Sequence, residues 1–451
     1  MRRNPVPLGR QTRPLDRRKL YFDMRTFLLL ITLINVLTSP VLAQTADSTV
    51  VVRFLEKISG HEIVAGQHNA EPNSAPAFST DSIESITGKV PGLWSGDFLY
   101  EPENIQTRRI MIDEAGREWN RGAIVQLMWH ACPPTSGEPC SWQGSSGVLS
   151  RLSDAQWDSL ITDGSALNAS WKRELDHIAP YLQSLKDNGV EVLFRPLHEM
   201  NQSAFWWGGR PGPNGTAKLY QITHDYLVKT KGLTNLIWEW DLQDFSTLSS
   251  DVNSYDPGGS YWDILALDVY GSDGQMYTTS KYNIILNKAG NKPIAIGECS
   301  QLPSDATLLQ QPRWTFFMAW PGLVFSSNTA AQIKTLYNSP NVITLAEMPG
   351  WNITGIQNWI FARPSSMRLS QNFPNPFNPT TMISYRLSVS CNVTLRVYDA
   401  LGRDVETLVN REEGPGWHEA RFNGAGLPSG VYFCRIVAGD YTATRKLALI
   451  K

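Results

Sequence analysis

The sequence predicts an α/β fold, a (β/α)8 TIM barrel, followed by a small all-β sandwich domain. Two observations support this prediction. Between residues 50 and 362, short apolar runs alternate with helical patterns, and nearly every run ends in a polar or aromatic side chain. After residue 362 the helical patterns stop, and alternating runs separated by turn residues take over, which is typical of antiparallel sheets.

Eight apolar runs are the candidate barrel strands. They are residues 63–68, 92–97, 123–130, 190–199, 236–242, 264–270, 293–298 and 315–320. Helical patterns such as 171–188 and 217–231 lie between them, as crossovers between parallel strands require. A doubly wound open sheet is the alternative. It fits less well because no Gly-rich phosphate loop follows the first run, and polar groups end nearly every run instead of clustering at one switch point.

The N-terminal residues predict a signal peptide. Basic residues precede Met24 and Arg25, residues 26–37 are almost wholly apolar, and Ala43 completes a small-x-small cleavage pattern. The apolar run is too short to span a membrane, and Met24 is an alternative start because a positive residue directly before the run is the usual arrangement. The expected organisation is a signal peptide, a catalytic barrel, and a linker with a β-sandwich, at residues 1–43, 44–362 and 363–451.

The charge balance excludes broad electrostatic partners. The 40 basic and 42 acidic residues give a net charge of -2, so no general attraction to nucleic acid or to an anionic membrane is indicated. The 16 Trp and 15 Tyr residues supply flat apolar faces with a polar group, which suit a neutral carbohydrate, although a Trp-rich core would account for about half of them. We expect a monomer that binds polysaccharide and no nucleic acid.

Two glutamates at the ends of apolar runs predict a glycoside hydrolase. Glu199 closes the segment 195–199 (Arg-Pro-Leu-His-Glu), and the aromatic residues 205–207 follow it as a shelf for a sugar ring. Glu298 ends another run, and the carboxyl ends of all strands in a closed parallel barrel meet on one rim. Glycosidases use two carboxyl groups that flank the scissile bond. Either glutamate alone would fit a solvated or salt-bridged strand end equally well.

Other side chains near the ends of these runs suit sugar binding, because they offer flat faces to C–H surfaces and polar groups to hydroxyls. These candidate substrate-binding residues are His68, Asp97, His130, His198, Trp206, Trp207, Trp240, Asp268, Tyr270 and Trp320. No metal or cofactor is expected. The His residues have neither H-x-x-x-H nor H-E-x-x-H spacing, and the adjacent His198 and Glu199 would point to opposite faces of a strand.

The five cysteines fit an oxidising compartment without forming a disulfide scaffold. Cys132 and Cys140 flank a short Pro/Gly loop and are expected to form a bridge. Cys391 and Cys434 are a second candidate pair. Cys299 is left over, and a packed, inert thiol is favoured over a nucleophile because no base is evident beside it.

Over roughly residues 50–360 the chain resembles glycoside hydrolase family 26, whose best-known members are retaining endo-β-1,4-mannanases on a (β/α)8 barrel. The family motif, Arg-Pro-x-His-Glu-x-Asn-Gly followed by Trp-Phe-Trp-Trp-Gly, corresponds to residues 195–208. The resemblance implies that Glu199 is the acid/base and Glu298 the nucleophile. It also implies that His130 reaches the cleaved sugar, that Tyr270 touches the nucleophile, and that His198 positions its neighbours.

The two proposed roles need opposite protonation states. A nucleophile must be ionised, which Tyr270 would favour as a hydrogen-bond donor to Glu298. An acid must hold its proton, which aromatic walls and nearby negative charge would favour for Glu199. Retention further requires that the two carboxyl groups lie roughly 5–5.5 Å apart.

Two residues depart from the family motif: Ala204 replaces the first Trp of the aromatic cluster, and Gln202 replaces the Gly. A sugar platform near the cleavage point is therefore missing, which leaves β-1,3-xylan and mixed-linkage β-glucan as alternatives to β-1,4-mannan. A non-catalytic polysaccharide-binding protein would have little reason to keep both acids. A surface adhesin would leave the motif around Glu199 unexplained.

The C-terminal segment predicts a small β-sandwich with a sorting role. Its expected strands are residues 381–386, 393–398, 416–422, 431–436 and 442–450. The Asn-Phe-Pro-Asn-Pro-Phe-Asn-Pro opening at 372–379, the turn at 397–403, the Leu-Pro-Ser-Gly-Val-Tyr segment at 427–432 and the basic end at Lys451 resemble the C-terminal sorting domain of type IX secretion cargo. That resemblance implies recognition of residues 366–451 by the type IX machinery, and secretion or cell-surface attachment through the periplasm of a Gram-negative bacterium. An accessory carbohydrate-binding module is the alternative.

Overall fold

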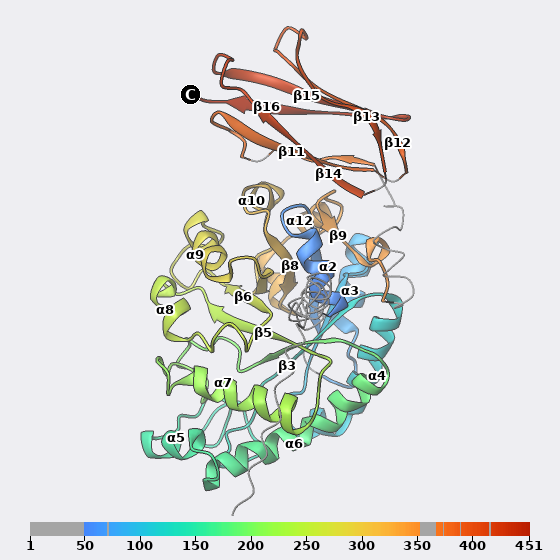
Figure 1. Cartoon of the computed structure of the whole chain (residues 1–451). Helices are drawn as coiled ribbons and strands as arrows, with labels where there is room; N and C mark the ends of the chain where they lie inside the picture. The colour runs from blue at the N-terminus through green and yellow to red at the C-terminus, as the bar shows by residue number, and fades with distance from the viewer. Residues whose placement is uncertain (1–48, 70–71, 352–366, 373, 388, 415) are drawn as a thin grey trace, which may run out of the picture. The chain divides into compact units, whose positions relative to one another are not determined.

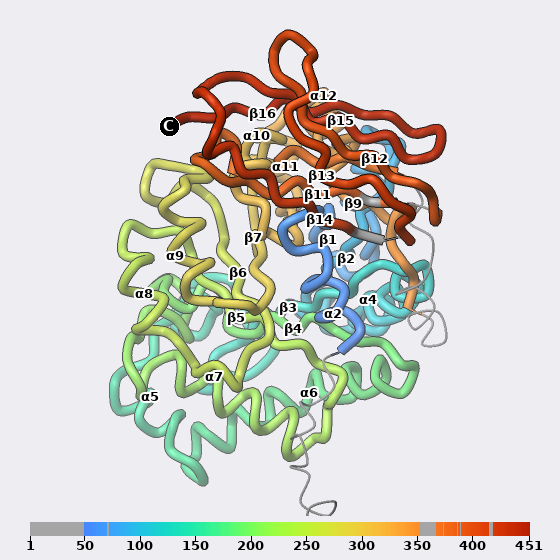
Figure 2. Tube along the Cα trace, turned by 45° about the horizontal axis from the view of Figure 1, so that its top comes forward, coloured from blue at the N-terminus to red at the C-terminus, as the bar shows by residue number. Residues whose placement is uncertain are grey.

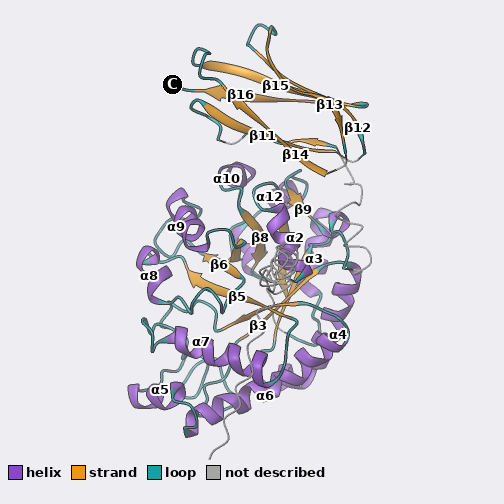
Figure 3. Ribbon diagram, viewed as in Figure 1, coloured by secondary structure: helices purple, strands orange, loops and turns teal. Residues whose placement is uncertain are grey.

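The computed structural model describes residues 49–69, 72–351 and 367–451, apart from 373, 388 and 415. Within these residues, an α/β part is followed along the chain by an all-β part (Figure 3). The signal peptide expected over 1–43 lies outside the described residues.

Eight parallel strands form a closed barrel. Their order is β2-β3-β4-β5-β6-β7-β8-β1, and β1 also pairs with β2, which closes the sheet. The strands are β1 (Ile63–Asn69), β2 (Leu93–Asp97), β3 (Ile124–Trp129), β4 (Val192–Pro196), β5 (Leu236–Gln243), β6 (Ile264–Val269), β7 (Ile294–Cys299) and β8 (Trp314–Ala319). Every residue in them is buried, as is typical of parallel strands covered on both faces. The predicted (β/α)8 barrel is confirmed.

Helices surround these strands as an outer layer (Figure 1). They are α2 (Val50–Ile58), α3 (Phe78–Thr87), α4 (Pro102–Arg121), α5 (Asp154–Ile161), α6 (Ala166–Asp187), α7 (Thr216–Asp225), the π-helix η1 (Tyr226–Thr230), α8 (Leu248–Ser254), α9 (Thr279–Ala289), α10 (Asp305–Gln310), α11 (Leu323–Ser327), α12 (Ala330–Tyr337) and the 3-10 helix η2 (Leu345–Glu347). In α6, Ser165 caps the N-terminus, and Trp171, Leu175, Ile178 and Leu182 form a buried stripe at helical spacing. A short strand, β9 (Val342–Ile343), pairs in parallel with β1.

The first helix is tied to the barrel by a distant carboxylate. The backbone N–H groups of Val50 and Val51 donate to Glu191 at 2.9 and 3.0 Å. These groups belong to the first turn of α2, where N–H groups have no partner within the helix and the helix dipole favours a negative charge. Glu191 therefore caps a helix from more than a hundred residues away.

The fourth strand is shorter than the apolar run 190–199 predicts. Pro196 has no N–H group to continue the ladder, and Leu197 and Glu199 have positive φ angles of 53° and 49°. The chain thus leaves the sheet at Pro196, the last residue of β4. His198 and Glu199 consequently lie in the loop after the strand.

The C-terminal part contains two antiparallel sheets. One has the order β10-β11-β14 and the other β13-β12-β15-β16. The strands are β10 (Arg368–Leu369), β11 (Thr380–Leu387), β12 (Cys391–Tyr398), β13 (Asp404–Glu413), β14 (Gly416–Asn423), β15 (Gly430–Ala438) and β16 (Tyr441–Leu449). Alternate residues of both sheets, such as Ile383 and Tyr385 of one and Val393 and Leu395 of the other, share one buried cluster. The predicted all-β domain is confirmed, and β10 and β13 are strands that the sequence analysis did not anticipate.

The cysteines are only partly as expected. Cys132 and Cys140 form a disulfide, with their Cα atoms 5.9 Å apart. The expected pair Cys391–Cys434 is wrong, because both thiols are free. Cys434 pairs across the sheet with Val397, six residues along β12 from Cys391, which is roughly 20 Å at the rise of a strand and far beyond the reach of a disulfide.

No helix among the described residues combines the length and apolar character needed to cross a membrane.

Candidate active site

The guanidinium group of Arg195, on β4, is the centre of a buried charge cluster. One of its nitrogens donates to Glu298 at 2.6 Å, and another donates to both Asp241 and Asp268. Its Nε atom lies 3.6 Å from a carboxyl oxygen of Glu239. Four carboxyl groups thus surround one cation, and the side chains of Arg195, Asp241, Asp268 and Glu239 are completely buried.

Strand geometry explains how these residues meet. They come from β4, β5, β6 and β7, which are neighbours in the barrel (Figure 2). Alternate residues of a strand point the same way, so Glu239, Asp241 and Gln243 of β5 all face the barrel interior. On β7, Gly297 is the extra residue of a bulge, because Leu267 pairs with Ile296 whereas Asp268 pairs with Glu298.

Gly297 is also a packing requirement. A Cβ atom at this position would lie 2.6 Å from Oδ1 of Asp268 and 3.1 Å from Oδ1 of Asp241. Any larger residue would therefore push apart the two carboxyl groups that share the Arg195 nitrogen.

Glu298 is held by two donors. Arg195 donates to one of its oxygens, and the Tyr270 hydroxyl donates to the other, each at 2.6 Å. Burial raises the pKa of Glu298, and the Arg195 charge and the Tyr270 hydrogen bond oppose that rise. Tyr270 reaches the partner that the sequence analysis expected for it.

Glu199 lies in a different environment. Its backbone N–H donates to Asp241 at 2.9 Å, and its carboxyl oxygens accept separate hydrogen bonds from Gln243, at 2.7 Å, and from Gln202. Burial, together with the negative charges of Glu298 and Asp241, holds the pKa of Glu199 well above its usual range. Of the two glutamates, Glu199 is thus the one set to keep a proton.

The two glutamates lie close to one another. One carboxyl oxygen each of Glu199, Asp268 and Glu298 lie within 4.8 Å of one another. Such a group of oxygens has the spacing of a metal site, but the guanidinium of Arg195 already binds two of the three carboxyl groups. Oxygens of Glu199 and Glu298 within 4.8 Å of one another are nearer than the roughly 6.5–9.5 Å between the carboxyl groups of inverting glycosidases.

A wall of histidine and aromatic rings stands beside the carboxyl groups. His130 donates its backbone N–H to Asp97 at 3.1 Å, and its ring also contacts that carboxylate. Although burial opposes ionisation, the contact with His130 lowers the pKa of Asp97 to about 2. The His130 ring meets the His198 ring edge-on, with their centroids 4.5 Å apart.

His68 and Trp320 form a second part of this wall. Their rings are stacked, with centroids 4.6 Å apart, and Trp320 lies 6.2 Å from the His130 ring. Burial lowers the pKa of His68 to about 3, so this ring is neutral at ordinary pH. The structure thus brings together His68, Asp97, His130, His198, Asp268, Tyr270 and Trp320 with both glutamates.

The expected aromatic shelf at 205–207 is largely buried. Trp206 is 1% exposed and donates to the carbonyl of Ala131 at 2.8 Å. Trp207 is fully buried, donates to the carbonyl of His198 at 2.9 Å, and stacks on Phe205. Trp207 therefore holds the segment that carries His198, Trp206 ties its own loop to the residue after His130, and neither offers an open face.

Trp142 is an exposed aromatic residue that the sequence analysis missed. It is 38% exposed, stacks on Tyr100, and meets the rings of His130 and Phe205 edge-on. It follows Cys140 of the disulfide by two residues. The sequence could have identified Trp142 because it comes directly after the loop that the disulfide closes, and that loop begins just after His130.

Trp240 is not brought to this site. It follows Glu239 on β5, so its side chain points out of the barrel, where it is fully buried and packs against Trp262. The residues that point inward from the same strand, Asp241 and Gln243, were missed. Their alternation with Glu239 along β5 could have identified them.

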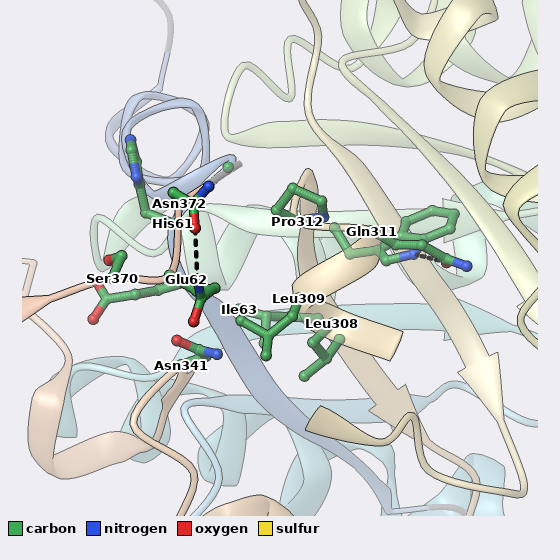
Figure 4. A pocket seen from close by; sticks show the side chains of 13 residues that line it. His61, Glu62, Ile63, Leu308, Leu309, Gln311, Pro312, Asn341, Ser370 and Asn372 are labelled. Atoms are coloured by element: carbon green, nitrogen blue, oxygen red, sulfur yellow. Dashed lines mark hydrogen bonds between the residues drawn. The ribbon is translucent and has the colours of Figure 1, made fainter. Parts of the chain in front are cut away.

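A different set of residues lies at the opposite end of the barrel. Figure 4 shows several of them, which include Ile63 at the start of β1 and Leu308, Gln311 and Pro312 before β8. Gln311 accepts a hydrogen bond from the Trp314 indole at 2.8 Å. Because the strands are parallel, their N-terminal ends face away from the rim that holds the carboxyl groups.

The barrel and the carboxyl pair together define a glycoside hydrolase site, and comparison with known proteins identifies the family. The model of glycosyl hydrolase family 26 matches residues 41–347, so this chain belongs to that family. The model of the secretion system C-terminal sorting domain matches residues 371–451. Both resemblances noted in the sequence are confirmed.

The relatives are mannanases by name. A mannan endo-1,4-beta-mannosidase from Thermothelomyces thermophilus is 31% identical over 327 residues, which are 68% of this chain and 62% of that protein. Mannan endo-1,4-beta-mannosidase A and B from Caldalkalibacillus mannanilyticus is 30% identical over 288 residues, which are 58% of this chain and 53% of that protein. The chain therefore spans less than two thirds of the length of either relative.

Solved structures show the same fold. GH26A from Muricauda sp. MAR_2010_75 is 34% identical, with a TM-score of 0.61 over 66% of this chain and 96% of that one. A beta-mannanase from a symbiotic protist of the termite Reticulitermes speratus, complexed with gluco-manno-oligosaccharide, is 28% identical, with a TM-score of 0.58 over 66% of this chain and 93% of that one.

Proposed function

We propose that this protein is a secreted, retaining endo-glycoside hydrolase that cleaves β-1,4-mannan, including glucomannan and galactomannan. The observation that carries the proposal is the pair Glu199 and Glu298. Oxygens of the two carboxyl groups lie within 4.8 Å of one another. Burial and neighbouring negative charges hold the pKa of Glu199 well above its usual range, whereas Arg195 and Tyr270 donate hydrogen bonds that favour the ionised form of Glu298.

In the first step, Glu298 attacks the anomeric carbon while Glu199 protonates the departing glycosidic oxygen. Arg195 and Tyr270 favour the ionised form of Glu298, against the effect of its burial. In the second step, Glu199, now a carboxylate, removes a proton from water, and that water releases the sugar from Glu298. Each step inverts the configuration at the anomeric carbon, so the product retains the configuration of the substrate.

The surrounding residues would hold the sugar. His130 and His198 offer polar ring atoms beside the carboxyl groups, while Trp320 and Trp142 offer aromatic faces. Asp97 fixes the His130 ring, and His68 supports the ring of Trp320. Trp206 and Trp207 act indirectly, through the loop that they pack. Asp268 would act through its ion pair with Arg195.

Mannan is the favoured substrate because the relatives described above are named mannan endo-1,4-beta-mannosidases and one structure holds a gluco-manno-oligosaccharide. The exposed Ala204, where the family motif has Trp, keeps β-1,3-xylan and mixed-linkage β-glucan as alternative substrates.

The sorting domain implies export to the outside of the cell or to its surface. We further propose that a signal peptide at 1–43 directs the chain to the periplasm of a Gram-negative bacterium, that the barrel domain extends over 44–362, and that residues 366–451 bind the type IX secretion machinery. The mature enzyme would act as a monomer.

The roles of the two glutamates are testable by substitution and rescue. Glu199→Ala and Glu298→Ala should each lose several orders of magnitude in turnover of soluble mannan. Azide should restore activity, with an inverted product, only to Glu298→Ala, because a small anion can replace a missing nucleophile. Glu56→Ala, at an exposed position of α2, is the matched control and should keep full activity.

Wild-type rates in either active-site variant would end the assignment. Reducing-sugar release from mannan, β-1,3-xylan and mixed-linkage glucan would rank the substrates, and no release from any of them would support a non-catalytic binding protein.

A further inference from the structure

The two oxygens of Glu199 are each covered by an amide. Gln243 donates to one of them at 2.7 Å, and Gln202 donates to the other. Gln202 is partly exposed whereas Gln243 is buried, so the oxygen beside Gln202 is the one that a glycosidic oxygen can approach.

The two amides are held differently. Gln243 is buried, and its own carbonyl oxygen accepts hydrogen bonds from the Asp244 N–H and the Ser272 hydroxyl, both at 3.2 Å. These donors fix the orientation of the Gln243 amide. Gln202 is partly exposed, and its side-chain hydrogen bond is the one to Glu199. Its backbone N–H is anchored to the Glu199 carbonyl at 2.8 Å, so the side chain stays beside the acid.

We propose that Gln202 is a positioning residue that covers the proton-delivering oxygen of Glu199 and stabilises the ionised form of this acid. The inference rests on the proposed role of Glu199 as acid/base. That role requires Glu199 to be protonated in the first step and ionised in the second. The Gln202 amide N–H donates to the Glu199 carboxyl group and so supports its ionised state.

The charges around Glu199 make a neutral donor valuable. Glu298 of β7, Asp241 of β5 and Asp268 of β6 face it with negative charge, and Arg195 of β4 faces it with positive charge. Tyr270, which follows β6, is also close enough to interact with it. Burial and the net negative charge both disfavour ionisation of Glu199, so each hydrogen bond to its carboxylate matters for the second step.

The test compares Gln202→Met with Gln202→Glu. Methionine keeps the length and neutrality of the side chain but removes the donor, whereas glutamate replaces the donor with a negative charge. The readout is the titration of the Glu199 carboxyl carbon by 13C NMR in the full chain, assigned by its loss in Glu199→Gln.

The midpoint should rise by about one pH unit in Gln202→Met, since the hydrogen bond from the partly exposed Gln202 amide to the buried Glu199 carboxylate is lost, and by more in Gln202→Glu. The basic limb of the pH profile of kcat/KM should move upward in the same order, because activity is lost when the acid ionises. Gln202→Met should unfold at the same temperature as the wild type.

An unchanged Glu199 midpoint in Gln202→Met, or a fall, would overturn this inference. The proposed function fails separately, if Glu199→Gln keeps wild-type turnover of mannan. A merely structural role for Gln202 would lower the unfolding temperature and leave the two pH midpoints unmoved, which also overturns the inference.

Discussion

Glu239 lies at the bottom of the charge cluster, fully buried on β5, with Gln126 donating to it at 2.7 Å. Burial, opposed by the Arg195 charge, raises the pKa of Glu239 from 4.5 to about 8. The folded protein thus keeps a proton on Glu239 that the unfolded chain releases above pH 4.5. Because the folded pKa is the higher one, the stability from this group is fully present below pH 4.5 and is lost as the pH rises toward 8.

The size of the effect follows from the shift. The difference, 8 − 4.5, is 3.5 pKa units, and each unit corresponds to about 1.4 kcal/mol. By proton linkage, about 3.5 kcal/mol of the stability that protonated Glu239 contributes is lost between pH 5 and pH 8. Glu239→Gln keeps the shape and the contact with Gln126 but cannot ionise. Between pH 5 and pH 8, the unfolding free energy of Glu239→Gln minus that of the wild type should therefore increase by about 3.5 kcal/mol.

Urea unfolding at pH 5, 6, 7 and 8, followed by tryptophan fluorescence, measures this difference. Of the 16 Trp residues, only Trp417 lies beyond residue 362, so the signal reports on the barrel. Glu56→Gln, at an exposed site, is the control and should run parallel to the wild type. If the unfolding free energy of Glu239→Gln ran parallel to that of the wild type, or fell relative to it as the pH rose, Glu239 would not carry a proton in the folded state.

Three further outcomes are expected. Tyr270→Phe removes a donor to Glu298, so the pKa of the nucleophile rises and the acidic limb of the pH profile of kcat/KM should move up by about one unit; an unmoved limb would contradict the role of the hydroxyl. Ala204→Trp restores an aromatic face at an exposed position and should lower KM on mannan about fivefold, for about 1 kcal/mol of stacking, whereas a gain on xylan or glucan alone would count against mannan. Deletion of residues 366–451 should leave the purified barrel active on mannan and abolish export from the host; loss of polymer binding with activity on short oligosaccharides retained would indicate a carbohydrate-binding module instead.

The barrel was predictable because its strands are continuous apolar runs that end in polar groups. The edge strand β13 was not, since its sequence, Asp-Val-Glu-Thr-Leu-Val-Asn-Arg-Glu-Glu, carries the charges that keep an edge strand from pairing with other chains. Alternating hydrophobicity in a sequence reflects the burial of every second side chain, so an edge strand with few buried residues shows little of this pattern. The expected bridge between Cys391 and Cys434 failed for a related reason, because it depended on strand register.

Within the site, the two glutamates could be found from their places at strand ends. The cluster around Arg195 could not, because it joins four strands that are distant in sequence, and the partners of a guanidinium group are fixed only by the closed barrel. Whether the side chains of Trp240, Trp206 and Trp207 line the site depends on the direction in which they point, and the sequence does not give that direction. Aromatic rings that suit a sugar also suit a core, and composition does not distinguish the two.

The left-handed backbone at Leu197 and Glu199 has an evolutionary consequence. Non-glycine residues in this conformation cost roughly 1–2 kcal/mol each, and only Gly, or less readily Asn and Asp, avoids most of that cost. Glycine at 199 would relieve the backbone and remove a buried, desolvated carboxyl group at the same time. The most stable descendants of this sequence would therefore include inactive ones. Directed evolution that rewards heat resistance without measuring turnover should lose Glu199 early.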